Sequence, residues 1–220
     1  MTSWLIYACR TDYTTEIQEI LLRSGFEKGL LLDNLLDETG RSAGESGVLS
    51  LADLDKLLCE RSVVVPLLTP GFRYRVVGEA QRAGLSTFPS LIDPTSVIAA
   101  SAVIGEGTVI NAGVVIGGET RVGRFVHINR SASVGHHNNI EDFSTVGPGV
   151  VLAGRVHLSR GVFVGAGAVC TPNVHIGPNA TVGAGAVVVR NVSAGTVVVG
   201  NPARTLREDG VGYGGSAVPL

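Results

Sequence analysis

Aliphatic residues recur at every sixth position through the second half of the chain. The series starts at Ile92, runs to Val188 without a break, and contains only apolar residues. Its members are Ile92, Ile98, Ile104, Ile110, Ile116, Val122, Ile128, Val134, Ile140, Val146, Leu152, Leu158, Val164, Cys170, Ile176, Val182 and Val188. Because a helix repeats about every 3.6 residues and a strand every 2, neither element explains this period. The pattern predicts a repeat architecture.

A second position supports the repeat. Four residues after each aliphatic residue the side chain is small or β-branched, as in Ser96, Ala102, Thr108, Val114, Thr120, Val126, Ala132, Asn138 and Ser144. A three-sided solenoid needs this combination, since aliphatic side chains fill its interior and small residues fit where the chain turns. Three segments of six residues then form a coil of eighteen. The count is unbroken to about Ser193, so we predict more than five coils and no extruded loop.

Before the repeat, strand and helix patterns alternate. The apolar runs that predict strands are Trp4–Ala8, Gly29–Leu32 and Ser62–Leu68, and the segments that predict helices are Thr11–Ser24, Leu51–Cys59 and Pro70–Ala83. We therefore expect a small α/β domain with about three parallel strands in residues 1–86 and the solenoid domain in residues 87–208. Residues 209–220 are rich in glycine and lack core residues, which predicts a flexible tail.

Composition narrows the possible partners and compartment. The chain has 220 residues, a net charge of −2 and 45% hydrophobic residues, with no basic run for a nucleic acid to bind. Cys9, Cys59 and Cys170 form no metal-binding spacing, which is typical of buried thiols in a reducing compartment. A signal peptide and an apolar run of about 20 residues are both missing, so we expect a cytoplasmic protein without a membrane span.

Several motifs in and around the repeat resemble one family. GHHNNIEDF (Gly135–Phe143), AGAVV (Ala184–Val188), VVVGNPAR (Val197–Arg204) and the junction FPSLIDPTSVIA (Phe88–Ala99) are similar to the NeuD/PglD family of bacterial sugar acetyltransferases. The resemblance covers nearly the whole chain. It implies a Rossmann-like α/β subdomain followed by a left-handed parallel β-helix of hexapeptide repeats. It also implies a homotrimer that binds acetyl-CoA between neighbouring β-helices, uses no metal, and acetylates an amino or hydroxyl group of a sugar.

The resemblance also assigns roles to individual residues. It places the catalytic general base at His136, an acceptor-binding residue at Asn129, and the cofactor groove at Thr145, Gly154, Ala166 and Ala184. Arg10 and Asp33 in the α/β domain are further candidates for acceptor binding. The family usually has an acidic residue after its catalytic histidine, whereas this chain has a second histidine there. The candidates to orient the base, or to play a secondary part, are therefore His137, Glu119, Glu141 and Asp142.

A further departure from the family lies after the first predicted strand. Relatives have a glycine-rich loop there, whose small residues let the backbone approach a nucleotide. This chain has ACRTDYTTE (Ala8–Glu16) instead, in which Arg10 could meet a phosphate by charge.

The period of eighteen by itself makes His136 unusual. It places Gly118 and Gly154 directly below and above His136, which leaves a notch on either side of the imidazole. A histidine on a solenoid wall is by default an ordinary exposed residue, but the flanking glycines favour a site. An imidazole with a pKa near 6.5 can take a proton from an attacking amine or hydroxyl. Because a thiolate leaves readily, direct attack in a ternary complex needs no covalent nucleophile, and the Gly154 N–H could stabilise the oxyanion.

Three alternatives stay open on these residues. A γ-class carbonic anhydrase uses the same β-helix but needs two zinc-binding histidines five residues apart, a spacing absent here. A non-catalytic hexapeptide scaffold is the second alternative. Within the enzyme hypothesis, the preferred acceptor is the amino group of a nucleotide-linked sugar. O-acetylation of a sialic acid, or acetylation of another small hydroxyl or amine, is the third alternative.

Overall fold

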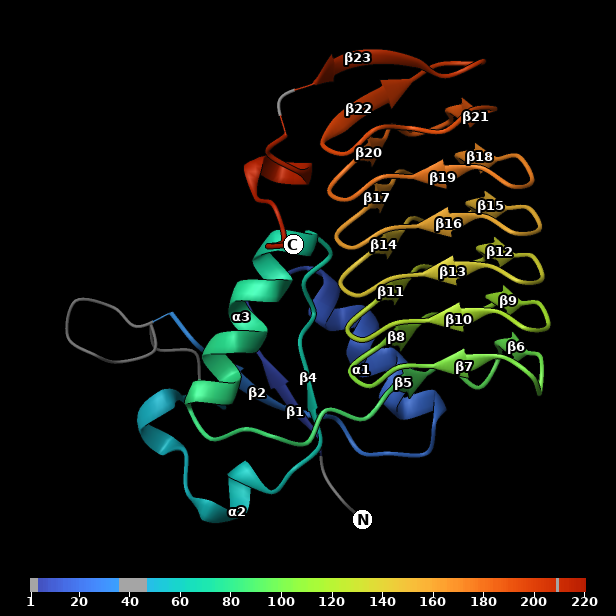
Figure 1. The fold of residues 1–220 in the computed structure, drawn as a ribbon. Helices are drawn as coiled ribbons and strands as arrows, with labels where there is room; N and C mark the ends of the chain where they lie inside the picture. The colour runs from blue at the N-terminus through green and yellow to red at the C-terminus, as the bar shows by residue number, and fades with distance from the viewer. Residues whose placement is uncertain (1–3, 36–46, 209) are drawn as a thin grey trace.

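The computed structural model describes residues 4–35, 47–208 and 210–220. Within them the chain forms an α/β unit that packs against one side of a tall stack of coils (Figure 1). In these described ranges, no helix is long and apolar enough to cross a membrane.

The α/β unit is built on a four-stranded parallel sheet in the order β3-β2-β1-β4. Its strands are β1 (Leu5–Tyr7), β2 (Leu30–Asp33), β3 (Val48–Ser50) and β4 (Val63–Val64). Its helices are α1 (Tyr13–Arg23), the short α2 (Lys56–Cys59) and α3 (Pro70–Arg82), with a 3-10 turn at Leu51–Asp53. The sequence predicted three strands here, and the edge strand β3 is the fourth.

Alternation along β1 explains why helices cover both faces of this sheet. Leu5 and Tyr7 belong to one apolar cluster and Ile6 to another, because successive side chains of a strand point to opposite faces. Helix α1 supplies Ile17 and its buried neighbours to the cluster around Ile6. Helix α3 supplies Val77 and Ala80 to the other cluster, so the sheet is buried between two helical layers.

The coils form a three-sided parallel β-helix whose faces we name by what they carry. The domain face, which the α/β unit covers, contains β5 (Leu91–Ile92), β8 (Val109–Ile110), β11 (His127–Ile128), β14 (Thr145–Val146), β17 (Phe163–Val164), β20 (Thr181–Val182), β22 (Thr196–Val199) and the antiparallel β23 (Arg204–Glu208). The valine face contains β6 (Val97–Ile98), β9 (Val115–Ile116), β12 (Ser133–Val134), β15 (Val151–Leu152), β18 (Val169–Cys170) and β21 (Val187–Val188). The polar face contains β7 (Val103–Ile104), β10 (Arg121–Val122), β13 (Asn139–Ile140), β16 (His157–Leu158) and β19 (His175–Ile176).

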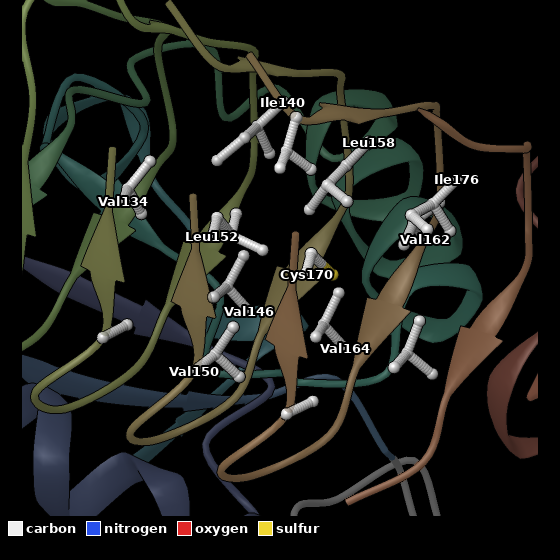
Figure 2. Packing of buried hydrophobic residues seen from close by; sticks show 14 of the residues in the cluster. Val134, Ile140, Val146, Val150, Leu152, Leu158, Val162, Val164, Cys170 and Ile176 are labelled. Atoms are coloured by element: carbon white, nitrogen blue, oxygen red, sulfur yellow. The ribbon is translucent and has the colours of Figure 1, made fainter. Parts of the chain in front are cut away.

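Strand register confirms the predicted coil of eighteen residues. Ser133 pairs with Val151, and His157 pairs with His175, each one coil apart. The second residue of each short strand points inward and forms the aliphatic column predicted from the sequence (Figure 2). Cys170 takes a place in that column, where burial raises the pKa of its thiol to about 12.

The small position of each repeat lines the inner corners of the prism. Where it carries a polar group, that group satisfies a backbone carbonyl of the following turn. Thr108 Oγ1 donates to the Gly123 carbonyl at 2.8 Å, and Thr120 Oγ1 donates to the Gly135 carbonyl at 2.8 Å. Asn138 is buried, and its side-chain amide donates to the Ala153 carbonyl at 3.0 Å. These bonds let polar side chains occupy the core without unsatisfied groups.

The C-terminal segment differs from the sequence prediction. Residue 209 lies outside the described residues, and residues 210–220 return along the β-helix to the N-terminal end of α3 (Figure 1). Val218 is 1% exposed, and its backbone N–H and C=O both bond the side chain of Asn179, at 2.8 and 2.9 Å. Tyr213 stacks on Phe163 with ring centroids 3.5 Å apart. The prediction that this tail lacks core residues is therefore wrong, because its one buried valine fits a site that folding creates.

Candidate active site

His136 lies at the corner of the prism between the valine face and the polar face. It follows β12 and precedes β13, in a turn whose backbone is held by the coils on both sides. The His137 N–H donates to the Gly118 carbonyl at 2.9 Å, and the Arg155 N–H donates to the His136 carbonyl at 3.0 Å. In a three-sided prism this corner is opposite the domain face, so His136 lies on the side away from the α/β unit (Figure 1).

The imidazole of His136 lies against Gly154 in the next coil. A Cβ atom at Gly154 would stand 2.8 Å from both Cε1 and Nε2 of the ring, closer than side chains tolerate. Gly154 therefore leaves the space that the ring occupies, as the coil period predicted. His136 is exposed, so its imidazole borders solvent at this corner.

His137 contacts His136 directly. The two Nδ1 atoms are 3.0 Å apart, and the rings are nearly perpendicular at 89°. His137 has a φ of 57°, a left-handed conformation that turns its side chain toward its neighbour rather than away from it. Of the candidates for orienting His136, His137 is the one that the fold places in hydrogen-bonding distance.

The acidic candidates are placed differently. Glu119 lies one coil below His137 in the same column. Glu141 and Asp142 sit at the next corner, between the polar and domain faces, where Glu141 bonds His157 Nε2 at 2.6 Å and Asp142 accepts the Arg124 N–H at 2.8 Å. The structure does not bring Glu141 or Asp142 to His136, because six residues along the coil carry the chain to a different corner.

The four residues assigned to the cofactor groove fall in three places. Gly154 lies with His136. Ala166 and Ala184 stack one coil apart at the corner between the domain and valine faces. Thr145 is 2% exposed, and its Oγ1 donates to the Leu68 carbonyl at 2.6 Å. Thr145 therefore lies in the contact between the α/β unit and the β-helix, and not in an open groove of this chain.

The predicted acceptor residues are also separated. Asn129 is buried at the corner between the domain and valine faces, where its Oδ1 accepts from the Asn111 side chain at 3.3 Å and from the Arg130 N–H at 2.8 Å. Arg10 and Asp33 form an ion pair at the carboxyl ends of β1 and β2. The structure thus keeps Arg10 and Asp33 together but brings none of the three to His136.

Arg10 lines a cavity of about 730 Å³ at this edge of the sheet. The lining is largely apolar, with Tyr7, Leu67 and Val76 among it, and it carries the charged side chains of Arg75, Glu79 and Arg82 on α3. Ala8 stands where the chain leaves β1 and adopts a φ of 60°. The turn thus takes the left-handed conformation that glycine would allow without strain.

Sequence reasoning missed the buried cation that joins the two parts of the molecule. Arg73 on α3 is fully buried and reaches the β-helix, donating to the carbonyls of Phe125 at 2.8 Å and Phe143 at 2.7 Å. Burial lowers the pKa of Arg73 to about 9. The signal in the sequence is an arginine four residues before Val77, on the apolar side of a predicted helix.

His127 is the second buried group at this junction. Its ring lies 5.8 Å from that of Tyr13 on α1, measured between centroids. Burial, and then the charge of Arg73, hold the pKa of His127 well below its usual value. His127 is therefore a neutral ring inside the junction between the α/β unit and the β-helix.

Metal ligands do not converge in the described parts of the chain: no group of three or more histidine, cysteine or acidic side chains there could hold an ion. At the His136 corner the structure places an exposed imidazole, its partner imidazole and backbone N–H groups, which can act in acid–base and oxyanion chemistry.

The β-helix and the small α/β unit before it are similar to solved structures of sugar acetyltransferases of the hexapeptide-repeat family. Solved structures confirm the predicted left-handed β-helix and the predicted resemblance. No protein-family model matches the chain, and no curated protein matches it by sequence.

Several solved structures are similar over almost the whole chain. A variant of the GDP-perosamine N-acetyltransferase from Caulobacter crescentus, in complex with CoA and GDP-perosamine, is 26% identical; the match covers 94% of this chain and 98% of that one, with a TM-score of 0.79. The acetyltransferase domain of PglB from Neisseria gonorrhoeae, in complex with acetyl coenzyme A, is 25% identical over 93% and 99% of the two chains, with a TM-score of 0.80. WeeI from Acinetobacter baumannii is 24% identical over 94% and 100%, with a TM-score of 0.76, and shows the fold alone.

Proposed function

We propose that this chain is an acetyl-CoA-dependent acetyltransferase that acts on the amino group of a nucleotide-linked sugar. The observation that carries the proposal is the similarity, over 94% of the chain, to an N-acetyltransferase with CoA and GDP-perosamine bound. The same function follows from the resemblance of the sequence motifs. The similarity to a domain that binds acetyl coenzyme A supports the choice of acyl donor.

His136 is the general base of the proposed reaction. Its Nε2 takes a proton from the acceptor amine as the amine nitrogen attacks the thioester carbon of acetyl-CoA. The resulting tetrahedral intermediate collapses by breaking the carbon–sulfur bond, and the thiolate receives a proton, so that an amide and free CoA are formed. The exposed position of the His136 side chain beside Gly154 supports this role, and the Gly154 N–H is a candidate donor to the oxyanion.

The cavity at the carboxyl ends of β1 and β2 is the proposed site for the nucleotide. Strand β1 lies between β2 and β4, so the chain reverses its order across the sheet here, which is where α/β sheets bind ligands. Arg75 and Arg82 supply positive charge for a diphosphate, and the apolar lining suits a base. Arg10 is held by Asp33, and its guanidinium reaches the same cavity.

A homotrimer completes the proposed site. Within one chain the cavity and His136 lie on opposite sides of the prism, so a nucleotide-linked sugar in the cavity must meet the His136 of a second copy. The valine face supports self-association, because Val97, Val115 and Val151 leave 63%, 46% and 40% of their surfaces exposed along one stripe. An apolar stripe of this kind is typical of a protein–protein interface.

The experiment that tests the activity follows release of free thiol from acetyl-CoA with 4-amino nucleotide sugars, sialic acids and simple amines as acceptors. We expect turnover with an amino nucleotide sugar, and His136→Ala should lower kcat by about 10²- to 10⁴-fold with little change in acetyl-CoA binding. His157→Ala is the matched control, since His157 is also partly exposed but bonds Glu141. Full activity of His136→Ala would reject the assignment of the base, and transfer only to sialic acid hydroxyls would reject the acceptor.

Subunit mixing tests the shared site. We expect His136→Ala and Val76→Trp, which fills the cavity, to be inactive alone. Mixed in equal amounts and allowed to exchange subunits, they should recover about a quarter of the wild-type activity, because an intact site needs one variant's His136 beside the other's cavity. No recovery in mixed trimers would place the site within one chain. Val151→Asp should dissociate the assembly in sedimentation velocity, whereas Val103→Asp on the polar face should not.

A further inference from the structure

The hydrogen bond between His136 and His137 admits only two arrangements of protons. The two Nδ1 atoms lie 3.0 Å apart, so exactly one of them must carry the hydrogen. If His136 donates, its Nε2 keeps a lone pair and can act as a base. If His137 donates, the single proton of a neutral His136 sits on Nε2, and no basic nitrogen faces the substrate. The tautomer of His136 therefore decides whether the proposed base can work.

We propose that His137 is a positioning residue: its neutral Nδ1 accepts from the Nδ1–H of His136 and keeps the Nε2 of His136 unprotonated. This inference rests on the proposed function, in which Nε2 is the base. When Nε2 takes the substrate's proton, the Nδ1–H bond to His137 is kept, so the ring does not have to turn during the reaction. A neutral acceptor thus holds the base throughout the reaction.

The backbone makes this arrangement rigid. The turn is bonded to the coil below through the His137 N–H and to the coil above through the His136 carbonyl. Gly154 receives the His136 ring on one side, and the perpendicular His137 ring meets its Nδ1 edge. The His136 ring therefore has Gly154 on one side and the His137 ring on the other.

One coil below His137 the same turn position is occupied by Glu119, and one coil above it by Arg155. All three residues occupy the same left-handed turn position, with φ of 59°, 57° and 58°. Residues of opposite charge thus stand on either side of His137 in one column of turns.

His137→Phe removes the acceptor and keeps the shape of the turn. Phe125 and Phe143 already occupy equivalent left-handed turn positions, with φ of 53° and 59°, so the variant should fold. Asn173→Phe is the matched control, because Asn173 takes the same turn position two coils above His137 with a φ of 65°. His137→Glu restores an acceptor with a different side chain.

The test reads the tautomer and the rate separately. Nitrogen-15 NMR of the full chain, which has five histidines, distinguishes Nδ1–H from Nε2–H at His136. We expect the Nδ1–H tautomer in the wild type and in Asn173→Phe, and a shift toward Nε2–H in His137→Phe. In the same variant kcat should fall at least about tenfold while KM for acetyl-CoA stays within about twofold, and His137→Glu should recover most of kcat.

Two results would overturn the inference. One is an Nε2–H tautomer of His136 in the wild type, and the other is an unchanged tautomer and kcat in His137→Phe. Failure of the proposed function is recognised differently, as a wild-type protein that turns over no acceptor. In that case the tautomer measurement would still decide whether His137 holds His136.

Discussion

Arg73 offers the most quantitative test of how the two parts of the molecule are joined. Its guanidinium donates to five backbone carbonyls and to Thr145 Oγ1, at distances from 2.5 to 3.2 Å. Of the five carbonyls, those of Leu68 and Ser144 have a second donor. Across the described residues, the carbonyls of Leu67, Phe125 and Phe143 have Arg73 as their sole donor. Replacing Arg73 by methionine, which keeps most of the aliphatic stem, would leave these three acceptors unpaired.

The magnitude follows from those three carbonyls. An unsatisfied buried acceptor costs about 1–3 kcal/mol, and the Leu67 bond is only partly buried, so the gross loss is roughly 2–9 kcal/mol. Removing a cation that is buried without a carboxylate returns part of this loss. We therefore expect Arg73→Met to lower the free energy of unfolding by about 3–5 kcal/mol, which corresponds to a fall in Tm of roughly 10 °C for a chain of this size.

Thermal unfolding followed by circular dichroism measures this loss, with Arg75→Met as the control. Arg75 lies on the same helix but is exposed, so its replacement should change stability by no more than about 0.5 kcal/mol. Limited proteolysis should also cut the α/β unit of Arg73→Met sooner than that of the wild type. A stability of Arg73→Met within 1 kcal/mol of the wild type, on the scale of a single net hydrogen bond, would refute the idea that Arg73 joins the two parts.

Three further predictions concern other buried or crowded positions. The fold holds the pKa of His127 below its unfolded value, so the stability that neutral His127 contributes is present above about pH 6.5 and is lost as the pH falls. Between pH 6.5 and 5, urea unfolding should show that the wild type loses up to about 2 kcal/mol more stability than His127→Phe. The same dependence of unfolding free energy on pH in both proteins would contradict this prediction. Gly154→Ala should displace the His136 ring and lower kcat at least about tenfold without loss of stability. Gly118→Ala should lower kcat less, and an unchanged kcat in Gly154→Ala would argue against this position of the ring. Val218→Ala should lower stability by about 1–3 kcal/mol in thermal unfolding, while a mobile tail would show no change.

The β-helix was predictable from sequence because its rules are local and repeated. Each inward aliphatic residue, such as Ile140, packs on residues one coil away. The need for an aliphatic side chain therefore recurs in every coil of eighteen residues, and the sequence shows it as a repeat. The notch around His136 follows from the same period of eighteen residues, since Gly118 and Gly154 are one coil below and above it. A periodic fold thus encodes both its core and the neighbours of a corner residue.

The contacts that break the period depended on the tertiary structure. Thr145 and Glu141 have ordinary positions in the repeat, but the α/β unit covers Thr145, and Glu141 bonds His157 at another corner. Val218 finds a buried site against Asn179, 39 residues earlier in the chain. Contacts of this kind do not follow the repeat, so the sequence pattern does not predict them.

The sequence by itself therefore determined the three-sided solenoid, the small α/β unit before it, and His136 with its flanking glycines. The tertiary structure alone decided that Arg73 joins the two parts, that the cavity lies opposite His136, and that His137 is the partner of His136. The physical reason is the range of the interactions involved. Packing between coils acts at a fixed separation along the chain, whereas a buried cation, a domain contact and a side-chain direction set by a left-handed φ arise only when distant segments meet.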